Sequence, residues 1–495
     1  MSPRIRAAII LTIVVITACT RNAPTATPTS TPAPTPTLGK IAWTSCGGGF
    51  LCGSIQVPLD YAHPSAGTID IAMNRKPATT PSQRIGSLLI NPGGPGASGI
   101  DWLAASAPAF AILNKRFDLV GFDPRGIGRS APVRCVDGPH MDTFVALDGV
   151  LDDPQEKAAA IQADKDFAAG CGQLSGKVLP FVDTVSAARD MDMMRSALGD
   201  DQFNYLGFSY GTYLGEHYAH LFPTHIRAMV LDAVLDPSLS ADDLNISQAA
   251  SFEKNLQAFL ANCNAHVSTT PKCAFAQSGD PASKLNALMQ KLDKTPLPVG
   301  NRLLTRALAQ TGVAQQLYDQ SLWSELDLGL TQADAGRGSL LLSFADSYLK
   351  RHPNGTYDNE IEANYAVNCL DHPALTDLSN YDQLGPAYAK ASAFFGPSFQ
   401  YSNLPCAFWP AQPTGHAGPL TAPGAPPILL VGGTNDPATP YSWAQAAHTQ
   451  LAGSVLVTRQ GNGHGSYGVS ICATIAEINY LVNLTLPSDG TVCSS

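Results

Sequence analysis

The pentapeptide G-F-S-Y-G at residues 207–211 puts Ser209 where a short apolar run, 203–206, meets a helix-like run, 212–220. A serine on a sharp turn between a strand and a helix exposes its Oγ, in a backbone that only small neighbours tolerate. The five letters alone are a weak signal, because the same composition can form a tight loop. The flanking strand and helix patterns favour a nucleophile at Ser209.

A serine hydroxyl needs a base to take its proton, and the base needs an acid to orient it and stabilise its charge. His464 is the predicted base, because it lies in a small-residue stretch, 461–466, that follows an apolar run near the end of the chain. A surface or packing role is the alternative for any histidine. The rival histidines lack such a setting: His217, His220, His372 and His416.

Asp436 is the predicted acid. It lies in a turn, 432–440, after an apolar run and 28 residues before His464, so the order is serine, acid, histidine. The same turn composition suits a helix N-cap, which is the alternative role for Asp436. Asp232, on the strand pattern that follows Ser209, is the second possible acid. Its position suits a structural or supporting role better.

A tetrahedral intermediate with a negative oxygen needs preorganised N–H donors. We expect one donor to be the backbone N–H of Tyr210, directly after the serine. The other should come from the glycine-rich loop 93–96, with Gly94 as the named residue and Gly93 next. These glycines could also merely form a turn.

Six apolar runs predict strands that are covered on both faces of a sheet: 85–90, 117–122, 203–206, 228–231, 428–431 and 454–458. Helical patterns lie between them, including 186–198 and 443–451. This alternation predicts an α/β fold with a doubly wound, mostly parallel sheet. Polar turns follow the strands, so the candidate residues should meet at the carboxyl edge of the sheet. Arg125, in one such turn, is expected to pair with a carboxylate and brace its loop.

The stretch 237–421 interrupts the alternation. It has helical patterns at 251–262, 281–292 and 313–325 and no clear strand. We interpret it as a mostly helical cap inserted between two strands, which would cover the catalytic turns and restrict access to them. The core is then expected in two parts, 40–236 and 422–495.

The N-terminal residues have the pattern of an export signal, with Arg4 and Arg6 before an apolar run, 7–16, that is short for a membrane span. The tetrapeptide I-T-A-C at 16–19 resembles a bacterial lipobox. It predicts cleavage after residue 18 and lipidation of Cys19, whereas an ordinary secretory signal is the alternative.

The next segment, 19–39, is rich in threonine and proline and predicts an extended tether with little to bury. With either kind of signal, the rest of the chain is expected outside the cytoplasm, anchored to the outer side of the membrane or secreted. Apart from the signal, no apolar run is long enough to span a membrane. The net charge of −10 and the lack of a basic run argue against a nucleic-acid partner.

Ten cysteines remain of eleven if Cys19 is lipidated, and an even number in an exported chain suggests disulfides. The sequence leaves their connectivity open. Pairing between neighbours along the chain is the working hypothesis: 46–52, 135–171, 263–273, 369–406 and 472–493. No C-x-x-C pair accompanies a histidine cluster, so neither a metal nor another cofactor is expected.

Four segments carry a family resemblance: L-L-I-N-P-G-G-P-G-A-S-G at 88–99, D-P-R-G at 123–126, G-F-S-Y-G-T at 207–212 and G-T-N-D-P-A-T-P at 433–440. Together they resemble the exported tripeptidyl aminopeptidases of actinobacteria, which are relatives of prolyl iminopeptidase in the α/β-hydrolase superfamily. The resemblance runs from about residue 41 to residue 493. It implies a serine exopeptidase that removes short peptides from a free N-terminus, with Ser209, Asp436 and His464 as its triad. Asn91 and Tyr210 stand where many prolyl iminopeptidases have His and Trp, so a preference for proline is not implied.

An aminopeptidase must hold the ammonium group of its substrate, and a desolvated ammonium needs a paired charge. The candidates are Glu216, which follows Ser209, and Glu362 and Asp371, which flank Cys369 in the cap region. Each could equally be a surface carboxylate.

Peptides are the expected partners of this enzyme, with the membrane reached through Cys19. A carboxylesterase or lipase is the alternative, because the same triad cleaves esters. A non-catalytic binding module is a weaker hypothesis, because no triad position is missing. The fold alone would not decide among these functions, and the oligomeric state stays open.

Overall fold

The computed structural model describes residues 41–267, 272–415 and 418–494. The predicted signal peptide (1–18), the tether (19–39) and the lipidation site Cys19 lie outside the described residues. Within the described ranges, no helix combines the length and the apolar character that a membrane span requires.

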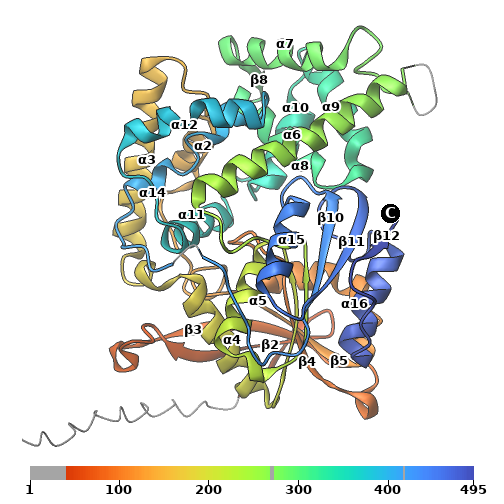
Figure 1. Ribbon diagram of the computed structural model, residues 1–495. Coiled ribbons are helices and arrows are strands. Elements are labelled where there is room, and N and C mark those ends of the chain that lie inside the picture. Colours follow the sequence, from red (N-terminus) through yellow and green to blue (C-terminus); the bar gives the residue numbers. More distant parts are fainter. Residues whose placement is uncertain (1–40, 268–271, 416–417, 495) are drawn as a thin grey trace, which may run out of the picture. The chain divides into compact units, whose positions relative to one another are not determined.

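A sheet of ten strands forms the base of the fold (Figure 1). From β5 to β12 the neighbouring strands pair in parallel, whereas β1, β2 and β3 pair antiparallel at one edge. The order across the sheet is β1 (Thr44–Gly47), β2 (Phe50–Pro58), β3 (Thr68–Lys76), β5 (Phe117–Phe122), β4 (Gly86–Asn91), β6 (Phe203–Phe208), β7 (Ile226–Asp232), β10 (Leu429–Asn435), β11 (Val455–Asn462) and β12 (Thr491–Cys493). This confirms the predicted α/β-hydrolase class with a mostly parallel sheet.

Both faces of the central strands are covered, which explains their continuous apolar runs. Leu88 and Ile90 of β4 pack toward α1 (Gly99–Ser106) and α16 (Ile471–Asn483). Leu89, which points to the other face, joins the apolar cluster of α4 (Thr184–Leu198), α5 (Tyr210–Leu221) and α15 (Tyr441–Gln450). Successive side chains of a strand point to opposite faces, so a strand between two helical layers must be apolar at every position.

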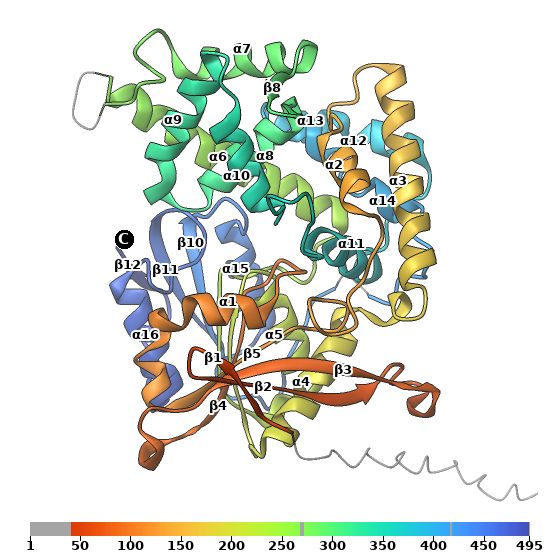
Figure 2. The same cartoon turned by 180° about the vertical axis from the view of Figure 1, so that it is seen from behind.

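The segment between β7 and β10 is mostly helical and has its own apolar core. Figure 2 shows these helices gathered beyond the carboxyl ends of the strands. One expectation is wrong: the region does contain strands, a small hairpin of β8 (Leu297–Val299) and β9 (Arg302–Leu304). The helices are α6 (Ala241–Ala265), α7 (Pro281–Lys294), α8 (Arg306–Leu317), α9 (Trp323–Asp334), α10 (Ser339–Tyr348), α11 (Glu360–Asp371), α12 (Leu378–Ala391), α13 (Gly396–Phe399) and α14 (Leu404–Ala407).

Two earlier helices, α2 (Gly138–Ala146) and α3 (Pro154–Ser175), contact this helical region although the sequence interpretation assigned them to the core. The rings of Phe144 and Phe167 stack at 4.5 Å and both meet Tyr365 of α11. The covering layer therefore takes helices from two separate parts of the chain.

All five neighbour pairings of cysteines are present as disulfides, so that hypothesis is confirmed: Cys46–Cys52, Cys135–Cys171, Cys263–Cys273, Cys369–Cys406 and Cys472–Cys493.

Candidate active site

Ser209 lies on the turn between β6 and α5 with φ 56° and ψ −128°, a left-handed backbone that is strained for a non-glycine residue, by about 1–3 kcal/mol. The two flanking glycines have no room for a side chain. A Cβ on Gly207 would lie 2.4 Å from the Gly211 carbonyl oxygen, and one on Gly211 would lie 2.7 Å from the carbonyl oxygen of Asn91. The half-buried Ser209 is thus held at the carboxyl end of the strand, as predicted.

His464 and Asp436 meet at the ends of the two neighbouring strands β11 and β10. The imidazole Nδ1 lies 2.8 Å from Asp436 Oδ1 and 3.0 Å from Oδ2. The carboxylate is fully buried and also accepts the N–H groups of Ala438, Thr439 and Gly465 at 2.9 to 3.1 Å. Asp436 thus also holds its own turn, but it is not the helix N-cap considered as its alternative role, because Pro440 stands at that position of α15.

The pair shifts the pKa of each partner toward the charged form. Burial by itself would raise the pKa of Asp436, but the charge and hydrogen bond of His464 hold it below its usual value. Burial alone would lower the pKa of His464, yet Asp436 outweighs burial and raises it. The site therefore stabilises the protonated imidazole that forms when His464 accepts a proton.

Asp232, the last residue of β7, joins the Ser209 turn to the His464 loop. Its carbonyl oxygen accepts the Ser209 N–H at 3.1 Å. Its carboxylate is fully buried and accepts the N–H groups of Ser466 and Tyr467 at 2.7 and 2.8 Å. The predicted supporting role of Asp232 agrees with this arrangement, since its carboxylate bonds to the loop backbone and not to the imidazole.

The Ser209 hydroxyl forms no hydrogen bond with any described residue. Hydrogen bonds of catalytic groups are often long without substrate and shorten in the reacting complex. Asp232 bonds to both segments and so ties the Ser209 turn to the His464 loop.

The loop after β4 lies directly against the Ser209 turn. A Cβ on Gly93 would come within 2.5 Å of the Phe208 carbonyl oxygen and 2.9 Å of Tyr210 N. The N–H of Gly93 is already used, because it donates to Asn91 Oδ1 at 2.9 Å. The N–H groups of Gly94 and Tyr210 have no acceptor among the described residues, which favours Gly94 over Gly93 as a donor to substrate.

Comparison of this sequence with known proteins identifies its family. A family model described as TAP-like protein matches residues 392–493. The chain is 35% identical over 483 residues to the serine protease Hip1 of Mycobacterium tuberculosis, covering 92% of this chain and 91% of that protein. It is also 35% identical over 454 residues to the tripeptidyl aminopeptidase of Streptomyces coelicolor, with 89% and 81% covered.

This chain belongs to the tripeptidyl-aminopeptidase-like family of α/β-hydrolases. It is a serine hydrolase. The carboxylesterase B of Mycobacterium tuberculosis is a further relative, 38% identical over 459 residues, with 90% of this chain and 86% of that protein covered. Relatives with different names therefore share this framework.

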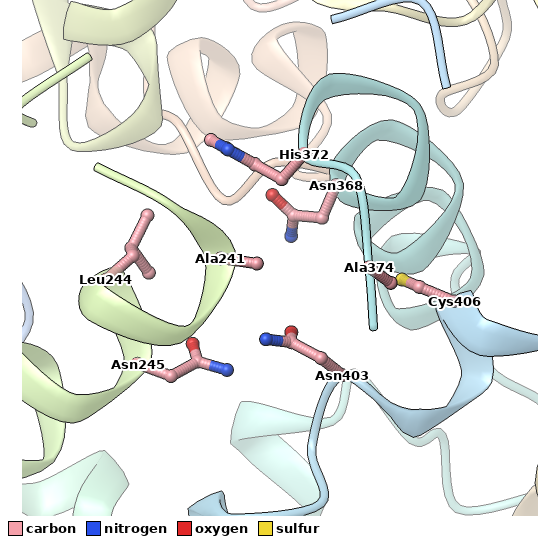
Figure 3. Close-up of a pocket in the computed structure, with 8 residues that line it drawn as sticks. All are labelled: Ala241, Leu244, Asn245, Asn368, His372, Ala374, Asn403 and Cys406. Atoms are coloured by element: carbon pink, nitrogen blue, oxygen red, sulfur yellow. The ribbon is translucent and has the colours of Figure 1, made fainter. Parts of the chain in front are cut away.

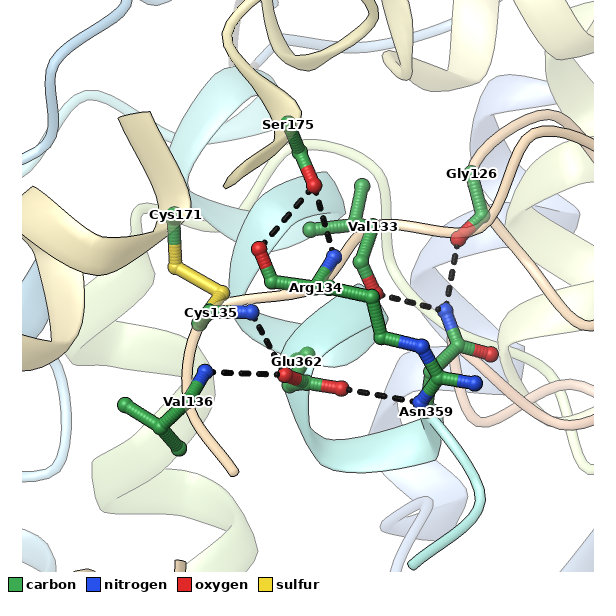
Figure 4. The surroundings of a disulfide bond; sticks show 9 residues. All are labelled: Gly126, Val133, Arg134, Cys135, Val136, Cys171, Ser175, Asn359 and Glu362. Atoms are coloured by element: carbon green, nitrogen blue, oxygen red, sulfur yellow. Dashed lines mark hydrogen bonds and ion pairs between the residues drawn. A yellow bond between two sulfur atoms is a disulfide. The ribbon is translucent and has the colours of Figure 1, made fainter. Parts of the chain in front are cut away.

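In this member of the family, the three carboxylates predicted to hold the substrate amine are all buried. Glu362 accepts the N–H groups of Cys135 and Val136 at 2.5 and 3.2 Å and lies 3.3 Å from Arg134 (Figure 4). Its carboxylate ties α11 to the chain next to the Cys135–Cys171 disulfide. These contacts favour a structural role for Glu362.

Asp371 supports the Ser209 turn indirectly. Its carboxylate accepts the Thr184 N–H at 2.9 Å and the Thr184 hydroxyl at 2.5 Å, and that hydroxyl lies 2.5 Å from the hydroxyl of Tyr210. Burial raises the pKa of Asp371 to about 7. This chain of contacts links the cap helix α11 to the residue that follows Ser209, so Asp371 is engaged within the protein.

Glu216 is fully buried on α5, and neither of its carboxylate oxygens has a partner among the described residues. Burial, with a smaller effect of Asp236, raises its pKa well above the ordinary value. A carboxyl group that is closed to solvent cannot contact the ammonium group of a substrate.

Arg125 is braced as predicted. Its guanidinium is fully buried and meets both carboxylate oxygens of Asp190 at 2.7 Å, and it donates to the carbonyls of Leu59 and Phe181. A bidentate pair of this kind fixes the loop after β5.

Tyr318, which follows α8 in the helical region, contacts His464 and was not predicted. Its carbonyl oxygen accepts the backbone N–H of His464 at 2.7 Å. Its ring packs edge to face against the imidazole, with 5.2 Å between the ring centroids. No sequence signal could have identified it, because the contact uses a backbone carbonyl and an ordinary aromatic ring.

Proposed function

We propose that this chain is a serine exopeptidase that cleaves short peptides from a free N-terminus through Ser209, His464 and Asp436. The observation that carries the proposal is the Asp436–His464 pair at 2.8 Å, joined through Asp232 to the strained Ser209 turn. The serine protease and the tripeptidyl aminopeptidase among its relatives support a peptide substrate.

In the first half of the reaction, Ser209 Oγ attacks the carbonyl carbon of the scissile amide and its proton passes to His464 Nε2. The N–H groups of Gly94 and Tyr210 stabilise the negative oxygen of the tetrahedral intermediate. His464 then gives the proton to the leaving nitrogen, the C–N bond breaks, and the N-terminal fragment stays on Ser209 as an ester.

In the second half, water attacks the ester carbonyl while His464 takes one of its protons. The ester bond breaks, the peptide acid leaves, and His464 returns a proton to Ser209 Oγ. Asp436 holds the imidazole in the required tautomer and stabilises its positive charge in both halves.

Export is part of the proposal. We infer a lipid anchor at Cys19 or, with an ordinary signal, a secreted enzyme. Labelling with palmitate should modify the wild type and not Cys19→Ala. Label retained by the variant would exclude Cys19 as the anchor site.

A carboxylesterase is the second candidate function, favoured by the relative named carboxylesterase B. A panel of tripeptide amides with free and acetylated N-termini, measured beside short acyl esters, separates the two. The exopeptidase proposal predicts rapid cleavage of the free-amine peptides alone among the amides. Rapid ester cleavage without cleavage of any free-amine peptide would support the esterase, and equal rates on free and blocked peptides would refute an exopeptidase.

A further inference from the structure

Glu360, the first residue of α11, lies against the loop that carries Gly94. A Cβ on Gly96 would come within 2.3 Å of the Glu360 carbonyl oxygen. One turn further along α11, the Asn364 side chain donates to the Pro95 carbonyl at 3.0 Å. The start of α11 is therefore fixed over the loop that lies beside Ser209.

The Glu360 carboxylate also acts electrostatically on two tyrosines of the helical region, Tyr318 and Tyr348. Burial is the main cause that raises the pKa of Tyr318 and of Tyr348, and the nearby Glu360 carboxylate adds to both shifts. Since Tyr318 bonds to the N–H of His464, the Glu360 carboxylate lies near the residues that hold the base. Glu360 thus sits between the two loops that border the reacting serine.

The carboxylate of Glu360 is half-buried and forms no hydrogen bond or ion pair with a described residue. The exposed Lys350 lowers the pKa of Glu360 and Asp358 raises it, and neither forms a hydrogen bond or ion pair with its carboxylate. Glu362, two positions along the same helix, has three polar partners instead. A partly desolvated carboxylate without a partner is costly, and a bound cation would remove that cost.

The face of α11 that begins at Glu360 is polar along its length. Glu360, Asn364 and Asn368 follow one another at intervals of four, so they share one face of the helix, and His372 follows directly after the helix ends. The amide of Asn368 donates to Asn364 Oδ1 at 3.0 Å. Amide side chains in such a row can hydrogen-bond to the backbone of an extended peptide.

At its far end this face borders a cavity between α11, α6 and the chain before α14, in which Asn368, Asn245 and Asn403 point toward one another (Figure 3). No carboxylate lines this cavity. Burial lowers the pKa of His372 to about 4, so its imidazole is neutral there. Among Glu360, Asn364 and Asn368, Glu360 is the acidic residue.

We propose that Glu360 binds the terminal ammonium group of the peptide and thereby selects substrates with a free N-terminus. The inference rests on the exopeptidase activity proposed above and names the residue that determines its specificity. Glu216, Glu362 and Asp371 are closed off or engaged, whereas Glu360 is half-buried, unpaired among the described residues, and held against the loop that carries Gly94.

The test compares Glu360→Gln with wild type on one tripeptide amide, offered with a free and with an acetylated N-terminus. Loss of a partly desolvated ion pair should lower kcat/KM for the free amine by roughly 30-fold or more, mainly through KM. The acetylated peptide should lose little. Asp334→Asn is the matched control, since it removes an exposed carboxylate of the same helical region that pairs with Lys284, and it should change neither rate.

Glu360→Lys gives a second test that does not depend on loss of activity. It should increase the turnover of an N-succinylated tripeptide amide relative to wild type, because the new cation would meet the succinyl carboxylate. Equal losses of Glu360→Gln on free and acetylated peptides, or no loss on the free one, would overturn the assignment.

Failure of the underlying function is distinguishable from failure of the Glu360 assignment. If the wild type itself shows no preference for a free amine, the exopeptidase proposal fails before any variant is measured. If the wild type requires the free amine and Glu360→Gln keeps that preference, only the role of Glu360 is wrong.

Discussion

Two fully buried aspartates end neighbouring strands of the sheet and hold the same loop in different ways. Asp232 ends β7 and Asp436 follows β10, and these two strands pair in parallel. Asp436 bonds to the imidazole of His464 and to the N–H of Gly465. The Asp232 carboxylate accepts N–H groups further along the same loop, and its carbonyl oxygen accepts the Ser209 N–H.

Their pKa shifts have opposite signs although both carboxylates are fully buried. Burial raises the pKa of Asp232, and its N–H donors and Arg459 do not reverse the shift. Burial acts on Asp436 in the same direction, but the ionisable partner His464 lowers its pKa overall. A position at the end of a strand thus places both aspartates near the His464 loop. Contact with the imidazole distinguishes Asp436 as the acid of the triad.

The largest expected effect comes from Asp436→Asn. An asparagine cannot stabilise the imidazolium or fix the correct tautomer, so kcat should fall by about 10⁴-fold. Steady-state hydrolysis of a free-amine tripeptide amide measures it, with circular dichroism to check the fold. Activity within tenfold of wild type would show that Asp436 is not the acid.

Asp232→Asn should reduce activity less than Asp436→Asn does. Weakening two buried hydrogen bonds to the loop should reduce kcat/KM by roughly 10- to 100-fold. The charge of Asp232 supports protonation of His464, so its removal should also lower the pKa of that imidazole. The acidic limb of the kcat/KM profile, where protonated His464 is inactive, should then move to lower pH.

This distinction between the two aspartates would be wrong if Asp232→Asn lowered kcat/KM as much as Asp436→Asn does and left the acidic limb of the profile unchanged. Asp232 would then be the acid, as the sequence alone had left open.

The smallest effect is expected at Glu477 of α16, which is fully buried near Asp232 with neither carboxylate oxygen paired among the described residues. Burial chiefly, with the Asp232 charge, raises its pKa well above the usual value. When the pKa of an acid is higher in the folded state than in the unfolded state, its contribution to folding stability is fully present below the unfolded-state pKa. That contribution is lost as the pH rises toward the folded-state pKa.

Glu477→Gln removes the ionisable carboxyl group and keeps a side chain of similar shape. Its Tm should equal that of wild type near pH 4 and exceed it increasingly up to pH 8. Thermal unfolding at several pH values measures this difference. A variant that loses stability relative to wild type as pH rises would contradict the raised pKa of Glu477.

The sequence predicted the six central strands because burial on both faces makes them continuously apolar. It missed β1 to β3 and β12, which lie at the sheet edges and are short or partly exposed, so their pattern is weaker. The expected helix at 313–325 is divided, since α8 ends at Leu317 and α9 begins at Trp323 after a short turn. Helical periodicity continues through such a turn and does not reveal it.

The candidate site was more predictable at its centre than at its rim. Glycine-flanked Ser209, and His464 and Asp436 in small-residue turns, have local signatures. Glu360 has no such signature, because its assignment depends on which of the neighbouring carboxylates already have partners. Only the folded chain shows that Glu362 is paired and Glu360 is not.

The central claim is that Ser209 carries the acyl group, and trapping that residue tests it most directly. A fluorophosphonate reagent, followed by peptide mass spectrometry, should modify Ser209 in the wild type and abolish hydrolysis, while folded Ser209→Ala should neither react nor hydrolyse peptide. An adduct on a different residue, with hydrolysis retained by Ser209→Ala, would contradict the account.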